Sequence, residues 1–204
     1  MKYAIISDIH GNSLALRAVL EDGKNKNVDR FLFCGYYFMS EGDPNDAVTQ
    51  LKNTPNSVII SGNHEGYLRN LENTDPADWV SPQFAPLYQS FRTLTQENRR
   101  YLETLPEYAD IEDGEIELHM AHKSTVFFGD AEMREYSSLQ FLKKYENRPY
   151  SREIFLRDIQ EYLERDLEFL QTLDTICAGI YIFGHTHVQW HAKIGDTLFI
   201  NPGA

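Results

Sequence analysis

YAIISDIHGN, at residues 3–12, joins a short apolar run to a group of polar residues and then to the start of a helix. Residues 3–7 have the length and apolar composition of a buried strand. Either Asn12 or Ser13 can cap the helix that follows, because both side chains can accept a backbone N–H of its first turn. A buried strand, a polar turn and an amphipathic helix in this order predict the first unit of an α/β sheet.

The same pattern continues along the first half of the chain. Apolar runs at residues 31–34 and 58–61 predict two further buried strands, and residues 43–51 predict a helix with a proline in its first turn. Strands that alternate with helices are typical of a parallel sheet covered by helices. Residues 76–105 then predict helices interrupted by prolines.

The second half predicts a more exposed sheet. Residues 115–120 alternate polar and apolar side chains, as a half-buried strand does, and residues 180–183 form another apolar run. Residues 188–193 and 197–200 predict a terminal hairpin. Residues 151–173 carry the apolar stripe of one long amphipathic helix.

The composition limits the class of protein. The chain has 204 residues, 42% of them hydrophobic and 25% charged, so we expect one globular domain over residues 1–204. Its formal net charge of −12 disfavours a nucleic-acid polymer as partner. The longest uncharged apolar run is far short of the roughly 20 residues that span a bilayer, and we see no signal peptide. We therefore expect a cytoplasmic protein, with Cys34 and Cys177 as reduced thiols in the core.

Polar side chains and histidines follow four of the predicted strands, at the edge where such sheets bind their ligands. They are Asp8, His10, Asn63, His64, Glu65, His122, His185 and His187. The spacing of two residues in Asp8 and His10, as in the His185 and His187 pair, places both side chains on one face of an extended backbone. Carboxylate, amide and imidazole ligands without a thiolate suit Mn, Fe, Ni or Zn, at one or two ions per chain.

These motifs resemble those of a known family. DIHGN at residues 8–12, GNHE at 62–65, GHTH at 184–187 and the terminal NPG at 201–203 look like the calcineurin-like metallophosphoesterases, as does His122 with Ser124 two residues later. The small bacterial and archaeal phosphodiesterase-like branch is the most similar. The resemblance covers the whole chain and implies a four-layer α/β/β/α sandwich with a two-metal site.

The resemblance also implies a role for each motif residue. The first ion would be held by Asp8, His10 and His187, and the second by Asn63, His122 and His185. His64 would contact the phosphate and protonate the leaving oxygen, oriented by Glu65. Water activated by the ions would attack phosphorus.

One position departs from the family pattern. The family has Gly-Asp in its second motif, with an Asp that bridges both ions, and the spacing aligns Tyr36 with that Asp. Two dications about 3.5 Å apart repel by roughly 20 kcal/mol at an effective dielectric constant of about 20, so losing a bridging carboxylate weakens the pair. Three alternatives stay open: Tyr36 ligates a metal as a phenolate, its ring fills the second metal pocket, or Glu41 or Asp43 supplies the missing carboxylate.

Two smaller departures concern the second half of the chain. Lys123 stands where the family usually has glycine, which places an added cation near the phosphate. Relatives usually continue beyond the position of Ala204 into further strands of the second sheet, so we expect a sandwich without these C-terminal strands.

These features predict a metal-dependent phosphoesterase that hydrolyses a small phosphodiester, phosphomonoester or nucleotide, with low activity because of Tyr36. The alternative is a catalytically impaired binding or scaffold module on the same fold. Retention of His64, Glu65 and the remaining ligands favours the enzyme, because a scaffold has no physical need for converging donors. We expect a small phosphate ester as partner, and aromatic-rich residues 79–91 and 125–150 to cover the site and set its specificity.

Overall fold

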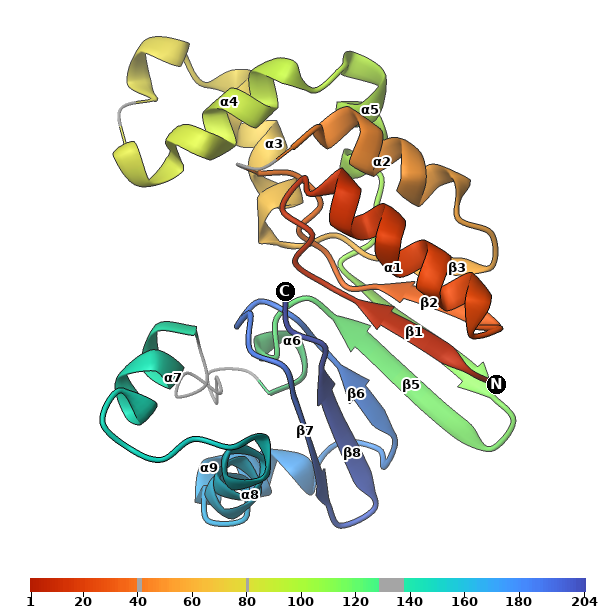
Figure 1. Ribbon diagram of the computed structural model, residues 1–204, viewed down its shortest axis with the longest axis vertical. Helices are drawn as coiled ribbons and strands as arrows, with labels where there is room; N and C mark the ends of the chain where they lie inside the picture. Colours follow the sequence, from red (N-terminus) through yellow and green to blue (C-terminus); the bar gives the residue numbers. More distant parts are fainter. Residues whose placement is uncertain (40–41, 80, 129–137) are drawn as a thin grey trace. The chain divides into compact units, whose positions relative to one another are not determined.

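The computed structural model describes residues 1–39, 42–79, 81–128 and 138–204 (Figure 1). These residues form two compact units, Met1–Glu107 and Tyr108–Ala204, which are described separately. The single domain over residues 1–204 therefore stays a prediction. Within the described residues, no helix is both long enough and apolar enough to cross a membrane.

The first unit contains the predicted parallel sheet. Its strands lie in the order β1 (Tyr3–Ile6), β2 (Arg30–Phe33) and β3 (Ser57–Ile59), and both neighbouring pairs are parallel. Helices α1 (Ser13–Asn25) and α2 (Pro44–Asn53) connect the strands and appear in red and orange in Figure 1. The alternation of strands and helices predicted from the sequence is confirmed. Each apolar run is long enough for only a short strand, and a capping side chain begins each of these two helices.

Asn12, one of the two candidates from the sequence, caps α1. The side chain of Asn12 accepts the backbone N–H of Ala15 at 3.0 Å. Helices α1 and α2 are joined by polar contacts, since Arg17 donates to Asp46 at 3.0 Å and Gln50 donates to the carbonyl of Ser13 at 3.0 Å. These contacts fix the two helices beside each other.

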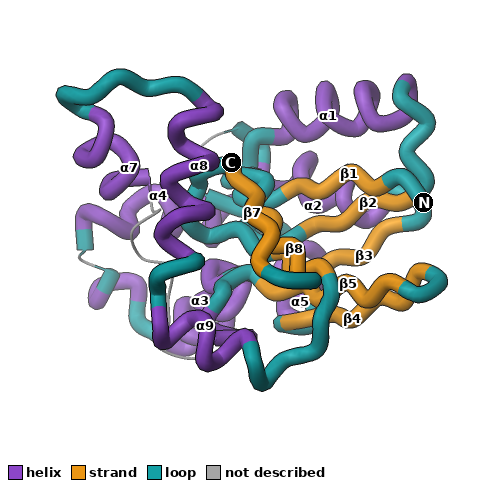
Figure 2. The backbone as a smooth tube through the Cα atoms, turned by 90° about the horizontal axis from the view of Figure 1, so that it is seen from below, coloured by secondary structure: helices purple, strands orange, loops and turns teal. Residues whose placement is uncertain are grey.

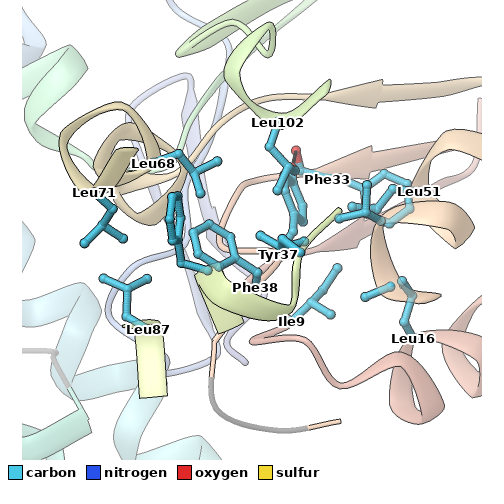
Figure 3. Packing of buried hydrophobic residues seen from close by; sticks show 14 of the residues in the cluster. Ile9, Leu16, Phe33, Tyr37, Phe38, Leu51, Leu68, Leu71, Leu87 and Leu102 are labelled. Carbon is cyan, nitrogen blue, oxygen red and sulfur yellow. Dashed lines mark hydrogen bonds between the residues drawn. The ribbon is translucent and has the colours of Figure 1, made fainter. Parts of the chain in front are cut away.

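Further helices complete the first unit: α3 (Asn63–Asn73), η1 (Pro76–Asp78), η2 (Pro82–Phe84), α4 (Ala85–Thr93) and α5 (Gln96–Glu103). The proline-interrupted helices are confirmed, whereas α3 was not predicted. Figure 3 shows the core, where Tyr37 and Phe38 lie among leucines of α3, α4 and α5. This core fixes the start of α3, which carries three of the motif residues.

The second unit is built on a mixed sheet of five strands in the order β4-β5-β6-β8-β7. The strands are β4 (Tyr108–Asp113), β5 (Ile116–Ala121), β6 (Ile180–Ile182), β7 (Trp190–Ile194) and β8 (Thr197–Asn201). The β4–β5 and β7–β8 pairs are antiparallel, and β5, β6 and β8 are parallel. Figure 2 shows strands β4, β5, β7 and β8 in orange. The terminal hairpin is confirmed, and its turn contains Gly195 at φ +58°.

The helices of the second unit are α6 (Thr125–Phe128), α7 (Ser138–Tyr145), α8 (Arg152–Leu163) and α9 (Leu167–Leu173). The single helix expected over residues 151–173 is therefore wrong. The break occurs because Asp166 caps a new helix, its carboxylate accepting the N–H of Phe169 at 3.1 Å. Both helices still bury apolar side chains, among them Phe155 and Phe169, in one core.

The two cysteines differ in their surroundings. Cys34 is buried at the end of β2, as expected, but Cys177 is exposed in the loop before β6. Neither Cys34 nor Cys177 forms a disulfide. The expectation of a core position is thus wrong for Cys177. The apolar run that contains it begins in the exposed loop, whereas β6 begins only at Ile180.

Candidate functional site

In the first unit, the loops that follow β1 and β2 run side by side beyond the sheet. The backbone N–H groups of Asp8, His10 and Gly11 donate to the carbonyls of Gly35, Tyr36 and Tyr37, at 3.1, 3.0 and 3.0 Å. The parallel pairing of the strands therefore continues into the loops. As a result, the DIHGN motif is held against the segment that contains Tyr36.

Asp8 and His10 adopt left-handed backbone conformations, both with φ of 54°. The extended backbone assumed from their spacing is therefore wrong. They are nevertheless close, since a carboxylate oxygen of Asp8 and a ring nitrogen of His10 lie within 4.8 Å of one another. A non-glycine residue in this region costs about 1–3 kcal/mol, and such strain is typical of functional sites.

Tyr36 also has a left-handed backbone, with φ of 70°, and its side chain is 7% exposed. Its ring centroid lies 4.2 Å from that of His10 and 3.6 Å from that of His64. Its hydroxyl donates to Sδ of Met39 at 3.7 Å. The tyrosine ring thus occupies the space between two motif histidines, which favours the alternative in which the ring fills a metal pocket.

Burial and charge act together on the phenol of Tyr36. Burial raises its pKa, and the nearby carboxylates of Asp8 and Glu65 raise it further. Such surroundings favour the protonated phenol over the phenolate. The position of the ring and the raised pKa therefore both favour a neutral Tyr36 in the protein without bound ions.

Glu65 is almost completely buried, and its carboxylate accepts three backbone hydrogen bonds. The donors are the N–H groups of Gly62 at 2.6 Å, Tyr36 at 3.0 Å and Tyr37 at 2.8 Å. The first bond caps α3, and the other two fix the loop after β2. This positioning of Tyr36 was not foreseen, whereas the orientation of His64 by Glu65 stays a prediction.

Asn63 and His64 form the first turn of α3. Asn63 Oδ1 is buried, and it accepts no hydrogen bond from any residue that the structure describes. An unsatisfied buried oxygen costs about 1–3 kcal/mol, so such an atom favours a missing donor or cation. His64 is 3% exposed and packs against Tyr36 on one side and the ring of Tyr67, 5.6 Å away, on another.

Of the two acids considered as a replacement for the bridging Asp, the structure describes only Asp43. Asp43 is exposed, and its carboxylate accepts the N–H groups of Asn45 at 2.9 Å and Asp46 at 3.2 Å, as the cap of α2. Asp43 therefore does not serve as that replacement. Glu41 lies outside the described residues.

In the second unit, the loop after β5 lies beside the loop after β6. The N–H of Gly184 donates to the carbonyl of His122 at 3.1 Å, and the rings of His122 and His185 are 5.3 Å apart in a T-shaped contact. His185 and His187 have left-handed backbones, with φ of 68° and 60°. Here too the expected extended backbone is wrong, although His122 and His185 are brought together as predicted.

Asn201 holds this histidine loop in place. It is fully buried at the end of β8, and its amide donates to the carbonyl of Gly184 at 2.8 Å and to Oγ1 of Thr186 at 2.9 Å. Its Oδ1 accepts the N–H of Gly203 at 2.9 Å. The NPG motif was noticed in the sequence without a role, and the structure supplies one.

Lys123 and the two remaining histidines of this unit, His119 and His191, are not among the predicted metal ligands, and the expected position of Lys123 near the phosphate stays a prediction. Lys123 is partly buried beside His122. His119 lies on β5, where its Nδ1 is 2.8 Å from a carboxylate oxygen of Asp110, while His191 is exposed on β7. Within each unit, two of the predicted ligands are thus brought together, Asp8 with His10 and His122 with His185, and the convergence of all six on one centre stays a prediction.

Comparison with known proteins identifies the family. The sequence profile of the calcineurin-like phosphoesterase superfamily domain matches residues 1–204, so the chain belongs to this superfamily. The MJ0912 protein of Methanocaldococcus jannaschii is 31% identical over 103 residues, which are 50% of this chain and 41% of that protein. The matched part thus spans less than half the length of that relative.

Solved structures share the fold. A metallophosphoesterase from Sphaerobacter thermophilus matches with a TM-score of 0.62 at 21% identity, over 100% of this chain and 76% of the other. Protein PH1004 from Pyrococcus horikoshii OT3 matches with a TM-score of 0.64 at 19% identity, over 99% and 76%. The predicted family and α/β fold class, with two sheets and their helices, are therefore confirmed.

The residues of the first unit fit a divalent cation in part. A carboxylate, an imidazole and a buried, unsatisfied amide oxygen are the oxygen and nitrogen ligands that such ions prefer. The position of the bridging carboxylate is instead held by a neutral ring. These described residues are candidate ligands for an ion, and the alignment of Tyr36 with the bridging Asp of the family stays a prediction.

Proposed function

We propose that this chain is a metal-dependent phosphoesterase that acts in the cytoplasm on a small phosphodiester, phosphomonoester or nucleotide. The observation that carries the proposal is the pair of Asp8 and His10, whose ligand atoms lie within 4.8 Å of one another on strained backbone. Strain of this kind is retained where a side-chain direction matters more than stability. Membership of the calcineurin-like phosphoesterase superfamily supports the same chemistry.

The proposed ligands are those of the family motifs. Asp8, His10 and His187 hold one ion, and Asn63, His122 and His185 hold the other. Bound Mn, Fe, Ni or Zn would lower the pKa of an attacking water and offset charge on the phosphoryl oxygens. The acidic chain leaves little positive potential elsewhere, which supports a small anion as substrate rather than a nucleic-acid polymer.

His64 is the proposed general acid. It stands directly after Asn63 in the first turn of α3, so a phosphate held at Asn63 has this imidazole beside it. Its ring packs against Tyr36, which keeps it from rotating freely. A positioned imidazole can donate its proton to the leaving oxygen as the phosphorus–oxygen bond breaks.

Tyr36 lowers the activity in this proposal. The six proposed ligands include one carboxylate, so two dications would leave about three positive charges without compensation. One ion is therefore bound well and the other weakly, until a substrate phosphate adds negative charge. Basal hydrolysis is accordingly slow.

The test combines elemental analysis with hydrolysis of a model diester and monoester panel in the presence of each of the four metals. Asp8→Asn, His187→Ala and the double variant should all lose the same ion, because both residues belong to one centre. Additive losses of two separate ions would contradict the shared centre. Absence of hydrolysis with every metal and substrate would contradict the enzyme.

The second candidate is a binding or scaffold module on the same fold. The specific observation that favours it is the ring of Tyr36, which fills the space between His10 and His64. A module of this kind would bind at most one ion and would show no turnover, even when the bridging carboxylate is restored by Tyr36→Asp.

A further inference from the structure

A pocket lies in the first unit, between residues of α3 and residues of η1, η2 and α4. Its volume is about 260 Å³, and its walls are formed mainly by the rings of Tyr67, Trp79, Phe84 and Tyr88. Trp79 and Tyr88 are stacked, with centroids 5.2 Å apart and an interplanar angle of 20°. Phe84 lies next to Tyr88 at 6.5 Å and meets Tyr67 edge-on at 6.1 Å. Four of the nine residues that line the pocket are therefore aromatic, and Leu71 and Leu87 add further apolar surface.

This aromatic pocket adjoins the proposed phosphate site through one residue. Tyr67 lines the pocket and also lies 5.6 Å from the ring of His64, the proposed general acid. Both residues belong to α3, one turn apart, so their separation is fixed by the helix. The pocket therefore shares Tyr67 with the surroundings of His64.

The lining of the pocket carries little charge, although the guanidinium carbon of Arg92 lies 5.2 Å from the ring centroid of Trp79. Asp78 is the one acidic residue of the lining, and no Lys, Arg or His is present among the described lining residues. Asn70 and Thr74 contribute polar groups at the same wall. The lining therefore suits a neutral, flat ring with hydrogen-bonding edges.

The volume restricts the ligand further. Sites for whole ligands have volumes of roughly 300–1,000 Å³, whereas this pocket has about 260 Å³. It can take one ring system rather than a complete nucleotide. Bases stack on aromatic side chains whatever their sequence, because every base has a π-face.

We propose that this pocket binds the nucleobase of a nucleotide substrate whose phosphate lies at His64. The inference rests on the proposed function for the phosphate, and it names the substrate class that this function left open. The base stacks among Trp79, Phe84 and Tyr88, while its polar edge reaches Asn70, Thr74 or Asp78. The sugar passes Tyr67.

Fluorescence can test binding without any hydrolysis. The chain has two tryptophans, of which Trp79 lines the pocket and Trp190 is 1% exposed in the core of the second unit. Titration of the full chain with adenosine, guanosine, cytidine or uridine should quench Trp79 in a saturable manner, and ribose should not. Because nucleosides carry no phosphate, the result does not depend on catalysis.

Variants then locate the binding. Tyr88→Leu should weaken nucleoside binding by about tenfold or more, since base–aromatic stacking contributes on this scale. Tyr88→Phe keeps the ring and should retain the affinity. Tyr108→Leu, at an exposed tyrosine of β4, is the matched control and should change nothing. Circular dichroism of each variant separates a loss of the fold from a loss of the ring.

Comparing the hydrolysis kinetics of a nucleoside monophosphate with those of ribose 5-phosphate tests whether the pocket and the proposed phosphate site bind the same substrate. The nucleotide should have the higher kcat/KM, and Tyr88→Leu should reduce this preference mainly through KM. Absence of quenching by every nucleoside, or equal kcat/KM for both substrates, would overturn the nucleobase assignment and leave the phosphoesterase intact. Saturable nucleoside binding without any hydrolysis would support the pocket and contradict the proposed function instead.

Discussion

The ring centroid of Tyr36 lies 3.6 Å from that of His64, at an interplanar angle of 40°. Tyr36 comes from the loop after β2 and His64 from the first turn of α3, and they are brought together because Glu65, which follows His64, accepts the backbone N–H of Tyr36. A residue in the position of a bridging carboxylate is thus packed against the proposed general acid. Tyr36 thus supports the ring of His64 at the position where we expect a bridging carboxylate in the family.

Tyr36→Asp should raise the metal content toward two ions per chain. The substitution adds a carboxylate and removes the ring between the two imidazoles, so the repulsion between ions is better offset. Turnover of a model diester should rise by roughly tenfold or more, as for other restored electrostatic contacts. Elemental analysis and steady-state kinetics measure both effects.

Tyr36→Phe is the matched control, because it keeps the ring and removes only the hydroxyl that contacts Met39. It should leave the metal content unchanged. If the unmodified protein already binds two ions tightly, or if Tyr36→Phe loses an ion, then Tyr36 or Glu41 is a ligand and the ring-filling interpretation is wrong.

His64→Ala should lower turnover by roughly a hundredfold while leaving metal content nearly unchanged, because a proton donor is lost and no proposed metal ligand is removed. Turnover and elemental analysis are measured on the same preparation. His191→Ala, at an exposed histidine of β7, should have no effect on either quantity. Equal turnover of the His64 variant and the parent would remove this residue from the mechanism.

Glu65→Gln should lower the free energy of unfolding by about 2 kcal/mol or more. The carboxylate accepts three backbone N–H groups, and an amide would direct its own NH₂ at one of these donors. Glu72→Gln, at an exposed glutamate of the same helix, should change stability by no more than about 0.5 kcal/mol. Urea unfolding measures both, and equal stabilities would show that the buried carboxylate is not needed.

Asn201→Asp should destabilise the second unit and weaken its histidine ligands. The new carboxylate can still accept from Gly203 but can no longer donate to Gly184, which leaves two oxygens facing each other at a cost of about 2 kcal/mol. Urea unfolding and metal content measure the two consequences. Asn147→Asp, at an exposed position, is the control. Unchanged metal content in a destabilised Asn201 variant would separate this residue from the site.

Much of the architecture is readable from neighbouring residues. The runs that became β1, β2 and β6 are short and apolar, and Asn12 needs only the next three residues to cap α1. Family motifs likewise occupy a few consecutive positions. These features depend on contacts within one turn or one strand, so they can be predicted without knowing how the rest of the chain folds.

Spacing alone misled where the backbone leaves the regular regions. Asp8 and His10 have left-handed φ values, and the helix expected over residues 151–173 breaks at the cap Asp166. Period-two and helical patterns assume that the regular conformation continues. Local side-chain hydrogen bonds and the pairing of one loop with another interrupt it.

The roles of Tyr36, Glu65 and Asn201 come from long-range contacts. Glu65 reaches a backbone 29 residues away, and Asn201 holds a carbonyl 17 residues away. The motifs marked these positions as special, but the partners of a buried carboxylate or amide depend on which backbone groups the fold leaves without a donor or acceptor beside it. Only packing of the loops against each other supplies that information, and it also sets the ring of Tyr36 between two histidines.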